Sequence, residues 1–87
     1  MYCILVYDVQ EKRVTKALKV CRGYLHWVQN SVFEGELTDG QFKELQSRLK
    51  KTIKPDKDSV LFYKFAHDGL FNKEIMSQER ATTDNML

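Results

Sequence analysis

The sequence has no long apolar run, no paired cysteines and a single proline. Cys3 and Cys21 form no C-x-x-C pair, and neither histidine is spaced near them as a ligand, so we expect two buried free thiols and no zinc site. No apolar run approaches the roughly 20 residues that span a bilayer. The N-terminus lacks a basic lead-in and a small-residue cleavage site. We therefore expect a cytoplasmic protein without a signal peptide or membrane contact.

The chain is also short, and its net charge is small. Its 87 residues fit one domain, which buries only roughly 60% of the surface that the unfolded chain exposes, so oligomerisation is a common remedy. The net charge of +2 conceals a local excess. Five cations lie between residues 12 and 22 with no acid among them, which favours phosphate contact over an ordinary solvated surface. These cations are Lys12, Arg13, Lys16, Lys19 and Arg22.

The first half of the sequence predicts a buried strand, a helix and a broken extended segment. Residues 2–9 are apolar with almost no alternation, which is typical of a central strand covered on both faces. Residues 11–24 carry an apolar stripe at helical spacing, and Gly23 ends that helix. Residues 27–37 are extended but would run about 36 Å as one strand, so we expect a kink, bulge or turn near residues 29–31.

The second half predicts one more helix and one more strand. Thr38 and Gln41 form a capping box, and Pro55 ends the helix that follows. Residues 59–66 read as a strand with Leu61, Tyr63 and Phe65 on one face. Residues 72–77 can form one short strand, which we expect to add to the edge of another sheet.

This order of elements predicts an α+β protein. Two helices on one face of a mostly antiparallel sheet give the ferredoxin-like βαββαβ sandwich. We expect residues 1–66 to form this core. We expect residues 67–87 to form a C-terminal strand and tail that belong to a dimer interface and pack on the dimer partner.

Asp8 follows the first apolar run, where a carboxylate is costly unless it reaches water or a partner. One interpretation is a turn residue or helix N-cap. The other is a metal ligand. A two-fold axis beside Asp8 would supply the same carboxylate twice, and a divalent cation would offset the repulsion between the two. His26 is a candidate general base by its place in the sequence, with a surface histidine as the alternative.

Three stretches carry a resemblance to a known family. They are "YDV" at the end of the first strand, "KRVTKAL" in the first helix and "WVQNSVFEGEL" in residues 27–37; "TTDNML" in the tail is similar to some endings. Together they resemble the CRISPR-associated protein family Cas2. "YD" alone is a weak motif, whereas "QNSVFEG" at this distance behind it is specific. Trp27 departs from the basic residue that some members carry there.

The resemblance implies a ferredoxin-like homodimer whose C-terminal strand packs on the partner's sheet. It implies a scaffold for spacer acquisition that binds duplex DNA and the CRISPR integrase of the Cas1 family. It also implies metal-dependent nuclease activity on RNA or double-stranded DNA, with Mg²⁺ or, as an alternative, Mn²⁺. The family's metal aspartate matches Asp8, and its other site residues match Tyr7, Arg13, Ser31 and Phe33.

Three functions remain open from the sequence. The first is the scaffold, which requires no catalysis. The second is a metal-dependent endoribonuclease or toxin-like phosphodiesterase acting at paired Asp8. The third is an RNA-binding module that displays the aromatic residues of "LFYKF" for base stacking. The first strand argues against this function, because it lacks a polar exposed face. Tyr7, Ser31 and Phe33 also have a structural interpretation, as core, interface or bend residues.

Overall fold

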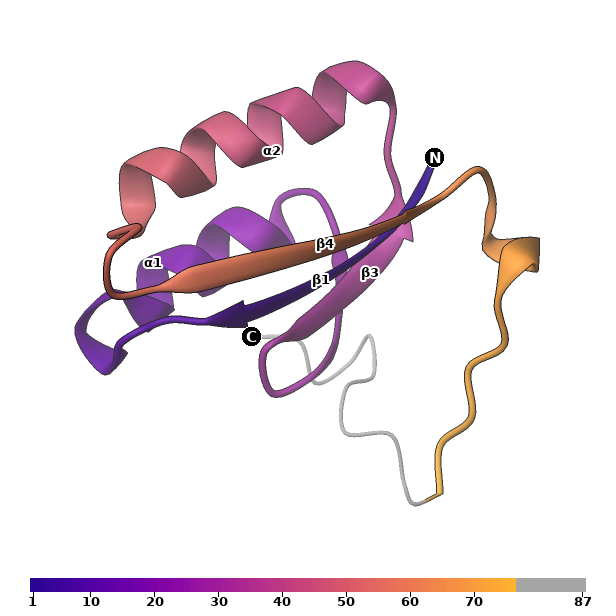
Figure 1. Cartoon of the computed structure of the whole chain (residues 1–87), viewed down its shortest axis with the longest axis horizontal. Helices are drawn as coiled ribbons and strands as arrows, with labels where there is room; N and C mark the ends of the chain where they lie inside the picture. The colour runs from indigo at the N-terminus through magenta and orange to yellow at the C-terminus, as the bar shows by residue number, and fades with distance from the viewer. Residues whose placement is uncertain (77–87) are drawn as a thin grey trace.

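A computed structural model describes residues 1–76 of the chain, so residues 77–87, which include "TTDNML", lie outside the described residues. Strands and helices follow in the order that the sequence predicts (Figure 1). A short 3₁₀ helix, Asp68–Leu70, which the sequence did not predict, follows them. The six main elements are β1 (Tyr2–Asp8), α1 (Glu11–Arg22), β2 (His26–Gln29), β3 (Val32–Glu36), α2 (Asp39–Thr52) and β4 (Ser59–Phe65).

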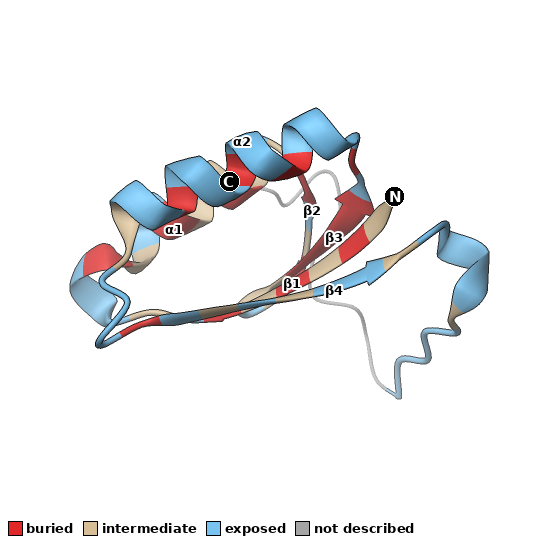
Figure 2. Cartoon of the chain, turned by 45° about the horizontal axis from the view of Figure 1, so that its top comes forward, coloured by how far each residue is buried: buried red, intermediate tan, exposed pale blue. Residues whose placement is uncertain are grey.

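The four strands form one antiparallel sheet in the order β2-β3-β1-β4. Strand β1 is central, as predicted, because β3 and β4 pair with its two edges. Figure 2 shows both helices on the same side of the sheet. The predicted ferredoxin-like α+β fold is therefore confirmed.

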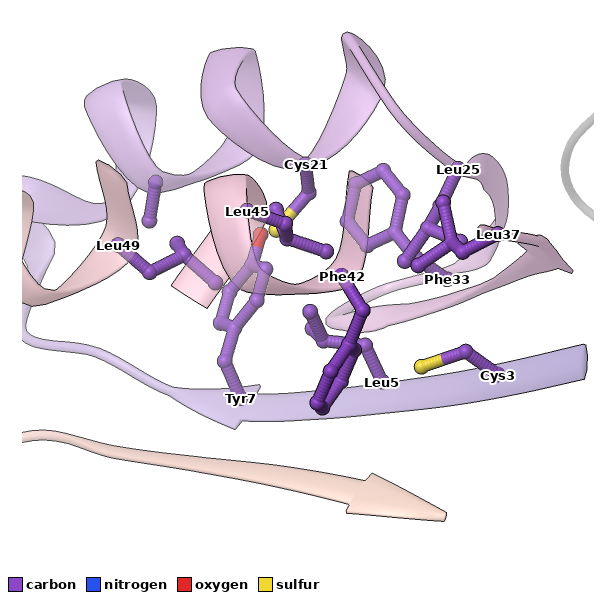
Figure 3. Close-up of a cluster of buried hydrophobic side chains, with 11 residues drawn as sticks. Cys3, Leu5, Tyr7, Cys21, Leu25, Phe33, Leu37, Phe42, Leu45 and Leu49 are labelled. Carbon is purple, nitrogen blue, oxygen red and sulfur yellow. The ribbon is translucent and has the colours of Figure 1, made fainter. Parts of the chain in front are cut away.

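The hydrophobic core lies between the helices and the sheet. Cys3, Leu5 and Tyr7 point from β1 toward the helices, where they meet Cys21 of α1 and Leu45 of α2 (Figure 3). Both cysteines are buried free thiols, as predicted. Burial of apolar side chains of this size contributes roughly 1.5–3 kcal/mol each. The remaining members of the core are Ala17, Leu25, Phe33, Leu37, Phe42 and Leu49.

The extended segment after α1 is divided by a tight turn, as predicted. Gln29 pairs with Val32, so Asn30 and Ser31 alone connect β2 to β3. Asn30 adopts a φ of 44°, and asparagine tolerates this left-handed conformation better than most residues. The indole Nε1 of Trp27 donates a hydrogen bond of 2.8 Å to the Asn30 carbonyl and stabilises the turn.

The start of α2 and the end of α1 both lie close to the predicted positions. Thr38 Oγ1 accepts a hydrogen bond from the Gln41 backbone N–H, and the Gln41 side chain accepts one from the Thr38 N–H, which confirms the capping box. Helix α1 ends at Arg22, and Gly23 follows it with a right-handed φ of −71°. The end of α1 therefore does not use the left-handed conformation for which glycine is usually selected at this position.

The sheet face away from the helices, called here the open face, is covered only in part. Its members on β1 and β4 include Ile4 and Val6, which are half-buried, and Leu61 and Tyr63, each 53% exposed. The sequence prediction that β1 is covered on both faces therefore holds for one face among residues 1–76. The predicted face of Leu61, Tyr63 and Phe65 is confirmed, because all three pair with open-face residues of β1.

The segment after β4 returns to one end of the open face. The Phe71 ring lies 5.4 Å from the Tyr2 ring and 4.8 Å from the Phe65 ring, centroid to centroid. Residues 72–76 contain no strand, while residue 77 of the predicted strand lies outside the described residues. The boundary at residue 66 stays a prediction. None of the helices in residues 1–76 is long and apolar enough to span a membrane.

Candidate functional site

Asp8 is the last residue of β1, and its side chain is exposed on the open face. Its Cα partner on β4 is Ser59, and Val6 precedes it on the same face. Helix α1 has Gln10 as its N-cap residue, so the N-cap interpretation of Asp8 is wrong. Within residues 1–76 the Asp8 carboxylate has no hydrogen-bond or ion-pair partner. An exposed carboxylate without a partner is available to bind a cation.

Tyr7 and Phe33 lie in the core on the other side of the sheet from Asp8. Tyr7 is 5% exposed and Phe33 is fully buried, and their ring centroids are 6.1 Å apart. Figure 3 shows the Tyr7 side chain pointing into the core toward α1 and α2. Burial raises the pKa of the Tyr7 hydroxyl, so it stays a neutral phenol near pH 7. These positions support the structural interpretation of both aromatic residues.

Ser31 lies in the turn between β2 and β3, close to the end of β1. Its backbone carbonyl accepts a hydrogen bond of 3.1 Å from the Tyr7 N–H. The described structure thus connects Ser31 to the residue before Asp8 through the backbone. Its side chain is half-buried and makes no hydrogen bond within residues 1–76. The role of the Ser31 hydroxyl stays a prediction.

Arg13 does not lie on the exposed basic surface of α1. Its side chain is 10% exposed, and its Nε atom lies 2.6 Å from Oδ2 of Asp58, whose side chain is fully buried. The Arg13 guanidinium and two backbone N–H groups hold the pKa of the Asp58 carboxyl well below its usual range. The expectation that groups Arg13 with the exposed lysines is therefore corrected, because a buried charge needs a partner and Asp58 supplies it.

Three of the predicted cations do face solvent from one helix. Lys12, Lys16 and Lys19 are exposed on α1, and Arg22 is half-buried at its end. Lys12 also lines an open hollow of about 580 Å³ together with Gln10 and Glu11. The residues that line this hollow follow Asp8 closely in the sequence. Phosphate contact by the exposed lysines stays a prediction.

A second polar group lies at the opposite end of the open face. Glu34 of β3 is 7% exposed, and Lys73 Nζ lies 2.7 Å from its Oε1. Burial and the Glu34 carboxylate raise the pKa of the nearby Tyr2 hydroxyl. His26 is exposed and pairs in register with Glu34. Asp8 instead lies at the far end of β1, four residues beyond Ile4, the Cα partner of Glu34, so His26 does not share a site with Asp8.

Sequence reasoning missed the residues that fix the surroundings of Asp8. Asp58 appeared to be one of several loop acids, and nothing in "KPDKD" marked it as buried. A signal for Arg13 was present, because Arg13, Ala17 and Cys21 recur at intervals of four and all three are buried. Among residues 1–76 no three His, Cys, Asp or Glu side chains gather as a metal-binding group. Asp8 therefore shares no such group with other side chains of residues 1–76.

Two helices on one face of a four-stranded antiparallel sheet, with an acid at the exposed end of the central strand, define a small ferredoxin-like α+β protein. The family model described as "CRISPR associated protein Cas2" matches residues 1–73. The chain therefore belongs to the Cas2 family.

Individual relatives agree with this assignment. The chain is 49% identical over 80 residues to the CRISPR-associated endoribonuclease Cas2 of Thermotoga maritima, with 92% of each chain covered. It is 39% identical over 87 residues to the protein of that name from Methanothermobacter thermautotrophicus, covering 100% of this chain and 96% of the other. A crystal structure of a Cas2 protein superposes with a TM-score of 0.85 at 42% identity, covering 100% of this chain and 98% of the other.

Proposed function

We propose that the chain is a cytoplasmic CRISPR adaptation protein that works as a homodimeric scaffold. In this role it binds duplex spacer DNA and the integrase during spacer acquisition. The single observation that carries the proposal is the apolar open face, on which Leu61 and Tyr63 of β4 are each 53% exposed and available to a second copy. Membership of the Cas2 family supports the pathway.

The open face is the surface on which a second copy would pack. Leu61 and Tyr63 expose about half of their surface there, beside the half-buried Ile4 and Val6 of β1. Burial of such a face is favourable at roughly 25 cal/mol per Å² of apolar area. A symmetric contact buries the same residues on both copies. It would bring the two β1 strands, and with them the two Asp8 side chains, toward one axis.

Paired Asp8 side chains fit a divalent cation. Mg²⁺ prefers oxygen ligands and keeps several waters, so two carboxylates from two copies suffice where one is a poor site. The exposed position of Asp8 leaves room for those waters. When bound, Mg²⁺ or Mn²⁺ would supply charge neutralisation at a phosphate and a bound water of lowered pKa. The protein's own part is to hold the two carboxylates close together.

The exposed lysines of α1 would position the nucleic acid. Lys12, Lys16 and Lys19 project from one helix that begins three residues after Asp8. Lysine contacts with phosphate are independent of sequence and weaken as salt rises. A scaffold for spacers of any sequence needs this kind of contact. In the dimer, two such helices would extend the binding surface along a duplex.

A second candidate function is a metal-dependent endoribonuclease acting at paired Asp8. The names of the relatives favour it, because the Cas2 proteins of both organisms above are called endoribonucleases. It uses the same dimer and the same carboxylates. The two candidates differ only in whether the physiological role requires cleavage.

One comparison separates these functions: wild type, Asp8→Asn and the control Asp39→Asn. Asp39 is an exposed acid that follows β3, whose last residue Glu36 pairs with Tyr2 at the other end of β1 from Asp8. Its replacement changes the net charge by the same amount. We expect Asp8→Asn to abolish Mg²⁺-dependent cleavage and to leave spacer acquisition with the integrase intact. Loss of acquisition while the dimer and its integrase complex persist would contradict the scaffold. Cleavage that persists in purified Asp8→Asn would contradict the metal site.

A further inference from the structure

A single buried carboxylate, that of Asp58, joins two segments beside Asp8 that are far apart in the sequence, residues 10–13 and residues 54–58. Asp58 Oδ1 accepts hydrogen bonds from the Gln10 N–H and from Arg13 Nη2, each 2.9 Å long. Asp58 Oδ2 accepts from Arg13 Nε at 2.6 Å and from the Lys54 N–H at 2.9 Å. The carboxylate thus receives four hydrogen bonds, two of them from the fork of one guanidinium. Bidentate pairs of this kind fix direction as well as distance.

These segments surround the end of β1. Gln10 lies two residues after Asp8, in the turn that leads to α1. Asp58 directly precedes Ser59, the Cα partner of Asp8 on β4. The turn after β1 and the loop before β4 lie side by side at the left of Figure 1. Arg13 also contacts the turn directly, because its Nη2 donates a hydrogen bond of 2.8 Å to Oε1 of Gln10.

The position of Asp8 depends on this backbone arrangement. Its carboxylate has no hydrogen-bond or ion-pair partner among residues 1–76, so no side-chain contact there orients it. A buried ion pair is often no more stabilising than apolar residues of similar volume, because desolvation opposes the attraction. What four convergent hydrogen bonds provide is a defined geometry. Here these hydrogen bonds fix the turn that directly follows Asp8.

We propose that Arg13 and Asp58 are positioning residues that hold the β1–α1 turn so that Asp8 can bind its cation. The inference rests on the proposed metal site at paired Asp8. Arg13 acts through Asp58 and the turn. Its guanidinium is turned inward and does not touch phosphate.

The inference separates two effects of replacing Arg13. If Arg13 positions Asp8, its loss weakens cation binding and leaves the affinity for DNA in the absence of metal unchanged. If Arg13 contacts phosphate, its loss weakens DNA binding and reduces the salt dependence by about one counterion. In that case the affinity for the cation stays the same.

The test measures Mn²⁺ binding to the full-length dimer by electron paramagnetic resonance. Wild type is compared with Arg13→Lys and with Asp58→Asn. Arg13→Lys keeps the positive charge but loses the guanidinium group that donates two hydrogen bonds to Asp58. The control is Arg48→Lys, the same substitution at an exposed position of α2. We expect the dissociation constant for Mn²⁺ to rise about tenfold in Arg13→Lys and Asp58→Asn, as for other residues that orient metal ligands. We expect no change in Arg48→Lys.

A second readout does not depend on the metal. In metal-free protein, we expect the amide resonances of Asp8 and Val9 to shift in Arg13→Lys and to stay in place in Arg48→Lys. All measurements are made at a temperature where each variant is folded by circular dichroism, so that lower stability alone does not change either readout. Unchanged Mn²⁺ affinity in Arg13→Lys would overturn the inference, and so would unchanged resonances of Asp8 and Val9 in that variant.

The same experiment distinguishes this inference from the proposed metal site. Asp8→Asn is measured in parallel. If wild type and Asp8→Asn bind Mn²⁺ equally, the metal site is wrong and the positioning role falls with it. If Asp8→Asn loses Mn²⁺ binding while Arg13→Lys retains it, the metal site stands and only the positioning role is wrong. A lower DNA affinity in Arg13→Lys with unchanged Mn²⁺ affinity would assign Arg13 to phosphate instead.

Discussion

The two faces of the sheet differ in how far the single chain covers them. On the helix side, Cys3, Leu5 and Tyr7 of β1 are 0–5% exposed beneath α1 and α2. On the open face, Leu61 and Tyr63 of β4 are each 53% exposed. Both faces are apolar along the same strands, so residue type alone does not distinguish them. Within residues 1–76, the two helices cover one face, whereas the other face leaves large apolar side chains half exposed.

The two ends of the open face also differ. At one end Glu34 is buried against Lys73, and Phe71 packs on Tyr2. At the other end Asp8 is exposed and has no side-chain partner within residues 1–76. One carboxylate is therefore part of the chain's own structure, and the other is available for chemistry. Burial and partners, rather than residue type, separate these two roles.

The largest expected effect is the loss of a core side chain. Leu5→Ala leaves a cavity beneath the helices and should lower the free energy of unfolding by about 2–5 kcal/mol. Leu61→Ala makes the same chemical change on the open face and should cost roughly 0.5 kcal/mol or less in the isolated chain. Urea denaturation at low protein concentration measures both. Equal losses would mean that the two faces are buried alike in a single chain.

The next effect concerns the open face in the proposed dimer. Leu61→Asp would bury an unpaired charge between two copies, so we expect the dimer dissociation constant to rise at least about 100-fold. Gln46→Asp places the same charge on the exposed side of α2 and serves as the control. Sedimentation velocity over a range of concentrations measures both constants. A Leu61→Asp variant that dimerises like wild type would place the contact elsewhere.

The smallest expected effect is a dependence of the free energy of unfolding on pH, caused by a buried thiol on the helix-covered face. Burial raises the pKa of the Cys21 thiol to about 12, whereas a thiol in the unfolded chain has a pKa of about 8.5. A raised pKa stabilises the fold fully below about pH 8.5, and this contribution decreases as pH rises toward 12. Between pH 8 and 10 we expect Cys21 to account for a loss of about 2 kcal/mol.

Denaturation of Cys21→Ala over the same pH range provides the comparison. Cys3 and Tyr7 also have raised pKa values through burial, so the wild-type loss includes their contributions. The difference between wild type and variant isolates Cys21. Identical pH profiles would mean that the thiol is already solvated in the folded protein.

The elements of the fold were predictable because their signals are local. The capping box of Thr38 and Gln41, the stop near Pro55 and the break near Asn30 each depend on residues within one turn of the chain. The shared face of Leu61, Tyr63 and Phe65 follows from the two-residue period of a strand. These features are confirmed to within a residue or two.

The surroundings of Asp8 were less predictable because they depend on distant contacts. Arg13 and Asp58 are 45 residues apart in the sequence, and the charge of Arg13 placed it with its neighbouring lysines. Asp8 itself was predicted at the end of the first strand, and the structure places it there. Tyr7 and Phe33 matched family positions, yet the alternation of strand residues directs both into the core.

The sequence by itself determined the order of elements, the fold class, the exposed lysines of α1 and the family. Each of these depends on local periodicity or on a contiguous motif. Only the tertiary structure decided that Arg13 turns inward to Asp58 and that Glu34 is buried beside Lys73. Charged side chains can lie in water or in a buried pair, and the choice depends on which segments the sheet brings together.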